Sequence, residues 1–166
     1  MKRFIQVGLM VCITVMVVTL SMLNKMHERM DVALEAFKIE NVSPDKYSNS
    51  INYTKPVRMY SIYKGDKFIQ YQIPGSPQGN FYAMEGATPS KLGISNMGYD
   101  PKMKTVVPKI KIVYVATKNF EALGSYAAPI IDDWSTPEIE TQTQGSELQI
   151  FTTCKPCFEK EIENEE

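Results

Sequence analysis

Histidine is almost absent from this chain of 166 residues, and the absence excludes several kinds of catalysis. The one histidine, His27, follows shortly after a long apolar run near the N-terminus. Ser-His-Asp hydrolysis, Cys-His catalysis and histidine-rich zinc sites all need an imidazole inside the folded body. We therefore expect any chemistry of this protein to proceed without histidine.

An excess of positive charge is also missing. The chain has 18 Lys and Arg against 19 Asp and Glu, so its formal net charge is -1 and no basic stripe stands out. Nucleic-acid binding is therefore disfavoured, because it depends on neutralising phosphates. Arginine is scarce as well: Arg3 and Arg29 flank the apolar run, which leaves Arg58 as the one arginine of the body.

The cysteines are too few for a structural zinc site. Cys12 lies in the apolar run, and Cys154 and Cys157 form a single C-x-x-C pair near the C-terminus. Because four ligands cannot be assembled from this pair within one chain, we expect no metal site. A local disulfide between Cys154 and Cys157 is favoured, with a thiol–disulfide redox site as the alternative.

Residues 4–23 form the one long apolar run, about the 20 residues that a helix needs to cross a bilayer. Residues 1–24 are therefore interpreted as a signal anchor or signal peptide. The run ends without a small-x-small cleavage site, which favours an anchor. The short cationic tail that precedes the run predicts an exported or membrane-anchored protein whose body is extracytoplasmic.

The remaining chain divides into three parts. Residues 25–55 contain an amphipathic pattern up to position 39 and then a stretch rich in Ser, Asn, Asp and Pro, which predict a membrane-proximal helix and a linker. Residues 56–158 are expected to form one α+β domain, a mainly antiparallel twisted sheet with long loops. Residues 159–166 hold five glutamates and are interpreted as a solvated acidic tail.

Several strands are predicted within the body. Residues 57–63 and 68–73 alternate in polarity on either side of a turn that contains Gly65, which predicts a β-hairpin. Residues 110–115 and 148–151 are the strongest further strands. A short helical turn is expected from Ser90 to Leu92.

Two polar features could carry chemistry. The glycine-rich turn 75–81 lets the backbone approach a ligand closely, although a plain turn explains it equally well. In the strand near the C-terminus, the period of two places Glu147, Gln149 and Phe151 on one face. A carboxylate beside an amide suits cleavage of an N-glycosidic bond, because the carboxylate stabilises an oxocarbenium-like transition state. An ordinary half-exposed strand is the alternative.

Taken in order, five segments resemble bacterial polymorphic toxin domains of type 46. These segments are 75–81, 86–89, 92–94, 128–135 and 145–151, with a predicted strand that ends near Val115 between the third and the fourth. They are more distantly similar to the NAD glycohydrolases that resemble the tuberculosis necrotizing toxin. Val57-Arg58-Met59-Tyr60 also resembles the first strand of ADP-ribosyltransferases. The resemblance implies an ADP-ribosyltransferase or NAD glycohydrolase-like fold, with NAD as the substrate.

The resemblance also implies roles for individual residues. Gln149 corresponds to the catalytic glutamine, with Glu147 beside it, and Phe81 lines the nicotinamide pocket. The other residues expected to bind NAD are Arg58, Tyr60, Gly79 and Trp134. The arginines that the necrotizing-toxin group uses are replaced here, where Ile73 and Leu92 stand. Phosphate binding is therefore assigned to Arg58 or to a lysine such as Lys91.

The function that we expect is cleavage of the nicotinamide–ribose bond of NAD, by hydrolysis or by transfer of ADP-ribose. Nicotinamide leaves as a neutral ring, so this reaction needs no general acid, which fits a body without histidine. A catalytically silent extracytoplasmic binding domain with a toxin-like fold is the alternative. The expected partners are NAD, a membrane, and a protein target or neutralising protein.

Overall fold

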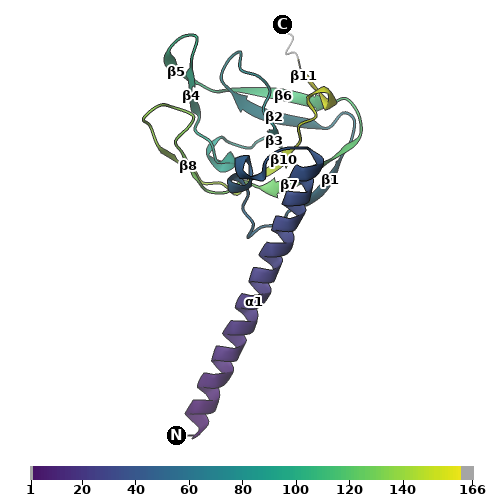
Figure 1. Cartoon of the computed structure of the whole chain (residues 1–166). Coiled ribbons are helices and arrows are strands. Elements are labelled where there is room, and N and C mark those ends of the chain that lie inside the picture. Colours follow the sequence, from purple (N-terminus) through teal and green to yellow (C-terminus); the bar gives the residue numbers. More distant parts are fainter. Residues whose placement is uncertain (1, 162–166) are drawn as a thin grey trace.

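A single helix, α1, runs from Lys2 to Ile39 and precedes the whole sheet (Figure 1). The computed structural model of this chain describes residues 2–161, so most of the predicted acidic tail lies outside the described residues. The apolar run and the predicted membrane-proximal helix are thus parts of one helix. It ends where Asn41 adopts a φ of 54° and Val42 N donates to Phe37 O at 2.9 Å, a left-handed helix cap.

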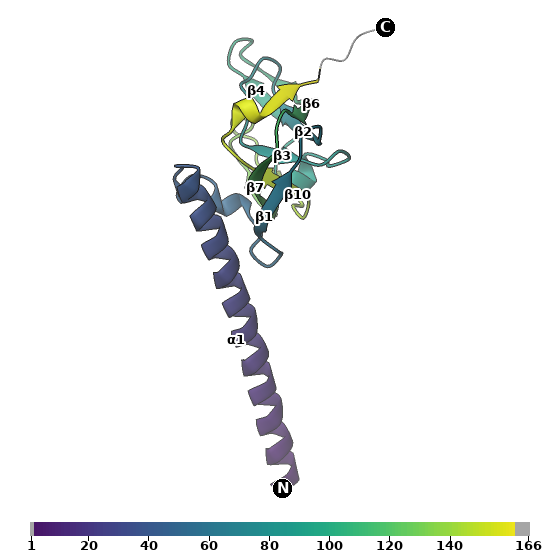
Figure 2. The same ribbon diagram turned by 90° about the vertical axis from the view of Figure 1, so that its right-hand side faces the viewer.

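The N-terminal part of α1 projects from the body as a free rod (Figures 1 and 2). The stretch Met10–Ile39 is long and apolar enough to cross a membrane by length and composition, and its most apolar window is not buried in the protein. The last turns differ, because Ala33, Ala36 and Phe37 are buried. The C-terminal end of α1 therefore belongs to the folded body.

The predicted linker that follows α1 packs onto the sheet. It contains two 3₁₀ turns, Pro44–Lys46 and Ser48–Ser50, followed by the buried Ile51, which forms a bridge with Ala127. The ring of Tyr47 lies 4.8 Å from that of Phe151, centroid to centroid. Because its apolar residues follow neither a helical nor a strand period, the sequence pattern did not reveal this packing.

Seven antiparallel strands form the main sheet in the order β1-β7-β10-β3-β2-β6-β11. Their bounds are Arg58–Ile62 (β1), Lys67–Gln72 (β2), Phe81–Ala83 (β3), Ile110–Ala116 (β6), Phe120–Tyr126 (β7), Leu148–Phe151 (β10) and Phe158–Lys160 (β11). Two small hairpins lie in the connections: Met97–Asp100 (β4) with Thr105–Pro108 (β5), and Ile131–Asp132 (β8) with Thr141–Gln142 (β9). The predicted α+β class and antiparallel sheet are confirmed, as is the helical turn Ser90–Leu92.

The predicted hairpin is wrong in its pairing. Both strands form, but β1 pairs with β7, where Met59 faces Leu123, and β2 pairs with β6, where Ile69 faces Val113. The turn between β1 and β2 bonds to the end of β6 instead, since Gly65 N donates to Ala116 O at 2.8 Å. Strands β6 and β7 have seven residues each, so they pair with β2 and β1 over the whole length of these shorter strands.

Strand β10 joins the two halves of the core. Ile150 packs on one face of the sheet with Tyr82 and Phe158, and Phe151 packs on the other face with Leu123 and the end of α1. Both side chains are almost fully buried, at 1% and 0% exposure. A central strand with two buried faces explains why its apolar character is so pronounced.

Replacing Phe37 by alanine should cost about 3–5 kcal/mol of unfolding free energy, because a fully buried ring is deleted. Ile39 is 72% exposed on the same helix, so Ile39→Ala should change the value by less than about 0.5 kcal/mol. Urea titration of the full chain in detergent, followed by the fluorescence of Trp134, measures both. Equal losses would contradict the docking of α1 on the sheet.

Candidate functional site

A cleft of about 1200 Å³ opens in front of strands β2 and β3 and has room for a dinucleotide. One wall is the turn segment after α1, from Asp45 to Ser50. The opposite wall is the loop after β7, from Ile130 to Pro137. The floor comes from β2, β3 and the residue Gln149 of β10. The cleft is therefore built from parts of the chain that lie far apart in sequence.

Four of the residues predicted from the sequence line this cleft: Gly79, Phe81, Trp134 and Gln149. Phe81 and Trp134 present aromatic rings, and Trp134 is 59% exposed. Aromatic rings of this kind can stack on nicotinamide or adenine. The structure thus brings together the aromatic residues and the amide that the resemblance selected.

The other predicted residues lie outside the lining of the cleft. Arg58 is exposed on the edge strand β1, and its guanidinium lies over the ring of Tyr60, 4.6 Å from the centroid. That ring packs closely over Gly124 of the neighbouring strand, where a Cβ would meet it at 2.0 Å. Glu147 and Lys91 are joined by a backbone bond, from Glu147 N to Lys91 O at 3.1 Å. None of these four side chains contributes to the cleft.

Gln149 is held firmly where the floor of the cleft meets the wall formed by residues Asp45 to Ser50. Its amide Nε2 donates to Ser50 O at 3.0 Å and to Ser125 Oγ at 3.4 Å, and the residue is only 3% exposed. The side chain therefore connects the turn segment after α1 to the central strands. Its position in the cleft is fixed by the same bonds that close this wall.

Gln70 was not selected from the sequence, yet it shapes the glycine-rich turn. Its Nε2 donates to Gly79 O at 3.0 Å and to Phe81 O at 2.7 Å, and its Oε1 accepts from Gly79 N at 3.1 Å and from Gln72 Nε2. The side-chain amide of Gln70 thus supplies hydrogen bonds to the backbone of Gly79 and Phe81 that a neighbouring strand would otherwise supply. In the sequence, the feature that could have drawn attention to Gln70 is its spacing of two from Gln72, which places both amides on one face of β2.

A buried carboxylate organises the opposite wall. Asp132 is fully buried and accepts hydrogen bonds from Ser95 N at 2.6 Å, from Ser135 N at 2.9 Å and from Ser135 Oγ at 2.5 Å. Burial alone would raise the pKa of Asp132, but these bonds and the charge of Lys109 outweigh it and lower the pKa. The loop is thereby fixed with Asp133 and Trp134 on the cleft.

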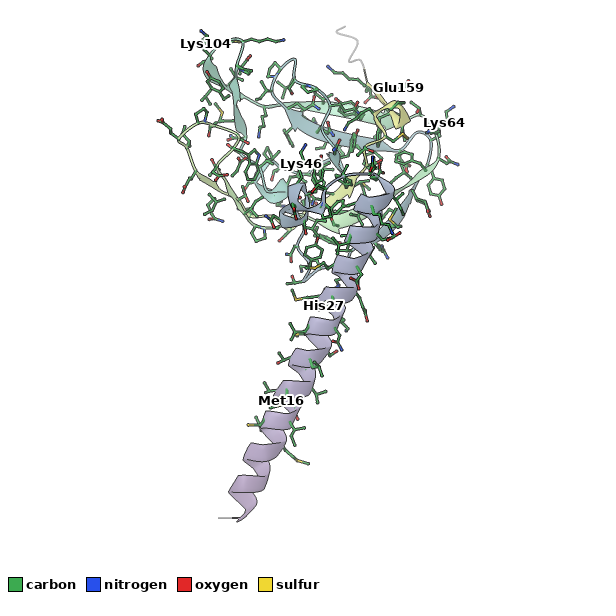
Figure 3. The ribbon with its side chains drawn as sticks, in the orientation of Figure 1. Met16, His27, Lys46, Lys64, Lys104 and Glu159 are labelled. Atoms are coloured by element: carbon green, nitrogen blue, oxygen red, sulfur yellow. A yellow bond between two sulfur atoms is a disulfide. The ribbon has the colours of Figure 1, made fainter. Side chains whose placement is uncertain are left out.

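Two lysines supply the positive charge of the described cleft lining, Lys46 and Lys109. Lys109 Nζ donates to Ser135 Oγ at 2.7 Å and to Ser95 O at 3.0 Å, which leaves one of its three N–H groups for another acceptor. Burial lowers the pKa of Lys109, and the nearby Asp132 opposes this shift. Lys46 is exposed on the turn segment near the end of α1 (Figure 3).

His27 is exposed on α1, just below the body in Figure 3, and it does not line the cleft. Within residues 2–161, no group of three or more His, Cys, Asp or Glu side chains is arranged to hold a metal ion.

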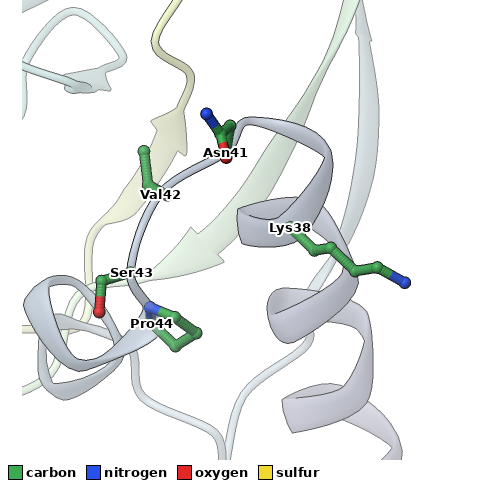
Figure 4. Close-up of a pocket in the computed structure, with 5 residues that line it drawn as sticks. All are labelled: Lys38, Asn41, Val42, Ser43 and Pro44. Carbon is green, nitrogen blue, oxygen red and sulfur yellow. The ribbon is translucent and has the colours of Figure 1, made fainter.

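A smaller hollow of about 390 Å³ lies at the turn after α1 (Figure 4). It is lined by Lys38, Asn41, Val42, Ser43 and Pro44. Figure 4 shows the side chain of Lys38 pointing away from Ser43 and Pro44. This hollow has neither an aromatic ring nor a carboxylate, and we assign it no ligand.

Residues 22–158 match the family model of bacterial toxin 46. The chain belongs to this family. The match begins within α1 and ends just after the disulfide, so it includes every wall of the cleft. The resemblance predicted from the five ordered segments is confirmed.

Among characterised relatives, the chain is similar to the NAD(P)(+) glycohydrolase toxin Tse6 of Pseudomonas aeruginosa, strain PAO1. The two are 34% identical over 132 residues, which is 77% of this chain and 31% of Tse6. The chain thus spans about a third of the length of that relative.

A solved structure that contains Tse6 agrees with the fold. A chain in the structure of Tse6 in complex with Tsi6 superposes with a TM-score of 0.72 and 30% identity, covering 83% of this chain and 97% of that one. A chain in the complex of Rhs1-CT with its cognate immunity protein RhsI1 matches at a TM-score of 0.42 and 16% identity, over 65% of this chain and 79% of that one. This toxin 46 domain therefore shares the fold of the Tse6 chain.

The substitution Asp132→Asn should lower the unfolding free energy by about 2 kcal/mol at pH 7, because an amide cannot accept all three hydrogen bonds. The folded pKa of Asp132 lies below its unfolded value of about 3.9, so its stabilisation is complete above that pH and is lost as the pH falls through the folded pKa. Urea titrations at pH 7 and pH 3 should show the gap between variant and wild type narrowing. The exposed neighbour provides the control, since Asp133→Asn should leave stability nearly unchanged at both pH values.

Proposed function

We propose that this chain is an NAD-consuming toxin domain that cleaves the bond between nicotinamide and ribose in the cleft of about 1200 Å³. The carrying observation is the convergence of Gly79, Phe81, Trp134 and Gln149 on one cleft that also holds two carboxylates, Asp45 and Asp133, and two lysines. The 34% identity with Tse6, an NAD(P)(+) glycohydrolase toxin, supports the same reaction class.

Asp133 is the carboxylate that we assign to the transition state. It is exposed on the cleft beside Trp134, whereas Glu147 lies outside the lining. When the bond from ribose C1′ to the nicotinamide nitrogen breaks, its electron pair leaves with nicotinamide and positive charge develops on the ribose. A nearby carboxylate stabilises that charge. Water then adds to C1′ and loses a proton, which gives ADP-ribose.

The remaining lining residues bind the substrate. Phe81 and Trp134 offer ring faces to the two bases, and the anchored amide of Gln149 orients the ribose or the nicotinamide carboxamide. The negative pyrophosphate is assigned to Lys46 and Lys109, because Arg58 and Lys91 lie outside the cleft. Arg58 and Tyr60 then stabilise the edge of the sheet.

Purified full chain in detergent should release nicotinamide from NAD, and Asp133→Asn should reduce the rate at least about 100-fold. Glu147→Gln should stay within about twofold of wild type. Chromatography of nicotinamide and ADP-ribose gives both rates, and trapping of labelled protein separates hydrolysis from transfer to an acceptor. If wild type neither turns over nor binds NAD, the alternative of a catalytically silent binding domain is correct.

Gln149→Ala should abolish NAD turnover and lower stability by about 1–3 kcal/mol, because Ser50 O loses its buried donor. Ser125→Ala is the matched variant, since it removes only the longer of the two bonds and should keep the activity. Turnover at 25 °C and urea midpoints are measured on the same preparations. A Gln149→Ala protein that is less stable yet fully active would show that the amide is structural alone.

The setting of the domain is also proposed here. The exposed apolar part of α1 suits a membrane anchor, and its short cationic tail favours a body on the extracytoplasmic side. A neutralising protein is the second expected partner, supported by the solved complex of Tse6 with Tsi6. Resistance of the chain to alkaline extraction from membranes, and protease access from one side only, test the anchor and its orientation.

A further inference from the structure

Lys155 reaches the rim of the cleft from the loop between the two bonded cysteines. The Sγ atoms of Cys154 and Cys157 form a disulfide. The residues Lys155–Cys157 form a 3₁₀ turn, which is followed directly by β11. Lys155 Nζ donates to Gly79 O and to Asn80 Oδ1. The disulfide loop is absent from the cleft lining, and the side chain of Lys155 bonds it to the cleft rim.

The rim segment from Gly79 to Phe81 is held from two sides. On the inner side, Gln70 binds the backbone of Gly79 and Phe81. On the outer side, Lys155 binds Gly79 and Asn80, and Asn80 O accepts from Thr152 N at 3.0 Å. Because Phe81 is the aromatic residue of this segment, its position in the cleft depends on both sets of bonds.

The loop that carries Lys155 is itself fixed at both ends. The carboxylate of Glu40, just after α1, accepts from Thr152 Oγ1 at 2.9 Å, from Thr153 N at 3.1 Å and from Thr153 Oγ1. Cys157 is buried in the core at 2% exposure. The bond to Cys154 therefore prevents the loop from swinging away, and it keeps the half-buried Lys155 against its acceptors.

We propose that Lys155 is a positioning residue for the substrate cleft, held against the Gly79–Phe81 rim by the Cys154–Cys157 disulfide. It does not line the cleft and acts through the rim segment, so that Phe81 meets the substrate ring in one orientation. This inference rests on the proposed function, since the cleft is taken as the NAD site. It assigns the C-x-x-C pair a role in substrate binding without thiol chemistry.

The kinetic test compares Lys155→Met, which removes the charge but keeps the stem, with Lys155→Arg, which keeps the donors. The full chain in detergent is assayed with NAD. We expect Lys155→Met to raise KM about tenfold with kcat changed less than about threefold, and Lys155→Arg to restore most of the affinity. An unchanged KM in the Met variant overturns the proposal. The matched control is Lys160→Met, at an exposed lysine of β11.

A double-mutant cycle tests the link to the disulfide. The paired change Cys154→Ser with Cys157→Ser should raise KM by a similar factor, and adding Lys155→Met to it should have little further effect, because both changes release the same contact. Effects that multiply would show that Lys155 and the disulfide act independently, which overturns the proposal.

Hydrogen exchange separates this inference from the proposed function, because it needs no substrate. Without NAD, amides of the peptide covering residues 79–83 should exchange faster in Lys155→Met and in the double serine variant than in wild type. Faster exchange confined to this peptide supports the positioning role even if wild type does not consume NAD. Unchanged exchange, or an increase that extends over β6 and β7, overturns it.

Discussion

The ring of Phe151 is the contact on which the rest of the structure depends. It is fully buried, and its centroid lies 5.0 Å from that of Phe37, 4.8 Å from that of Tyr47 and 5.1 Å from that of Phe81. These rings come from α1, from the turn segment after it and from the cleft floor. Tilted and edge-to-face contacts of this kind stabilise beyond the area they bury. One side chain thus fixes the helix, one wall of the cleft and its aromatic residue.

The class of fold could be predicted because strands such as 110–115 and 148–151 have a strong local signal. The strand pairing could not be predicted, because the partners of β1 on β7 lie some sixty residues away and no turn sequence joins the two strands directly. For a related reason, the sequence predicts only a linker up to residue 55. Tyr47 and Ile51 pack as single side chains, and single contacts leave no period in the sequence.

There is also a physical reason why four of the predicted site residues lie on one cleft. Gly79, Phe81, Trp134 and Gln149 belong to segments recognisable in order, and the sheet gathers those segments on one cleft. Arg58 is predicted from the chemistry of its guanidinium and from a resemblance of one short strand, and neither tells an edge strand from a cleft wall. The sequence carries no local signal for Lys109, because its bond to Ser135 joins residues far apart in the chain. Asp133 lies on the cleft because the buried Asp132 beside it fixes the loop.

Because α1 is one continuous helix whose end is buried in the body, its apolar part and the body are joined rigidly, without a flexible linker. Arg29 Nη1 donates to Tyr53 O at 3.0 Å, so the body already grips the helix six residues after the apolar run ends, which is roughly 9 Å along its axis. In a bilayer, the tilt of the helix would therefore set the direction in which the cleft faces. The cleft would then lie at a fixed height above the lipid surface, and its opening would face in a fixed direction.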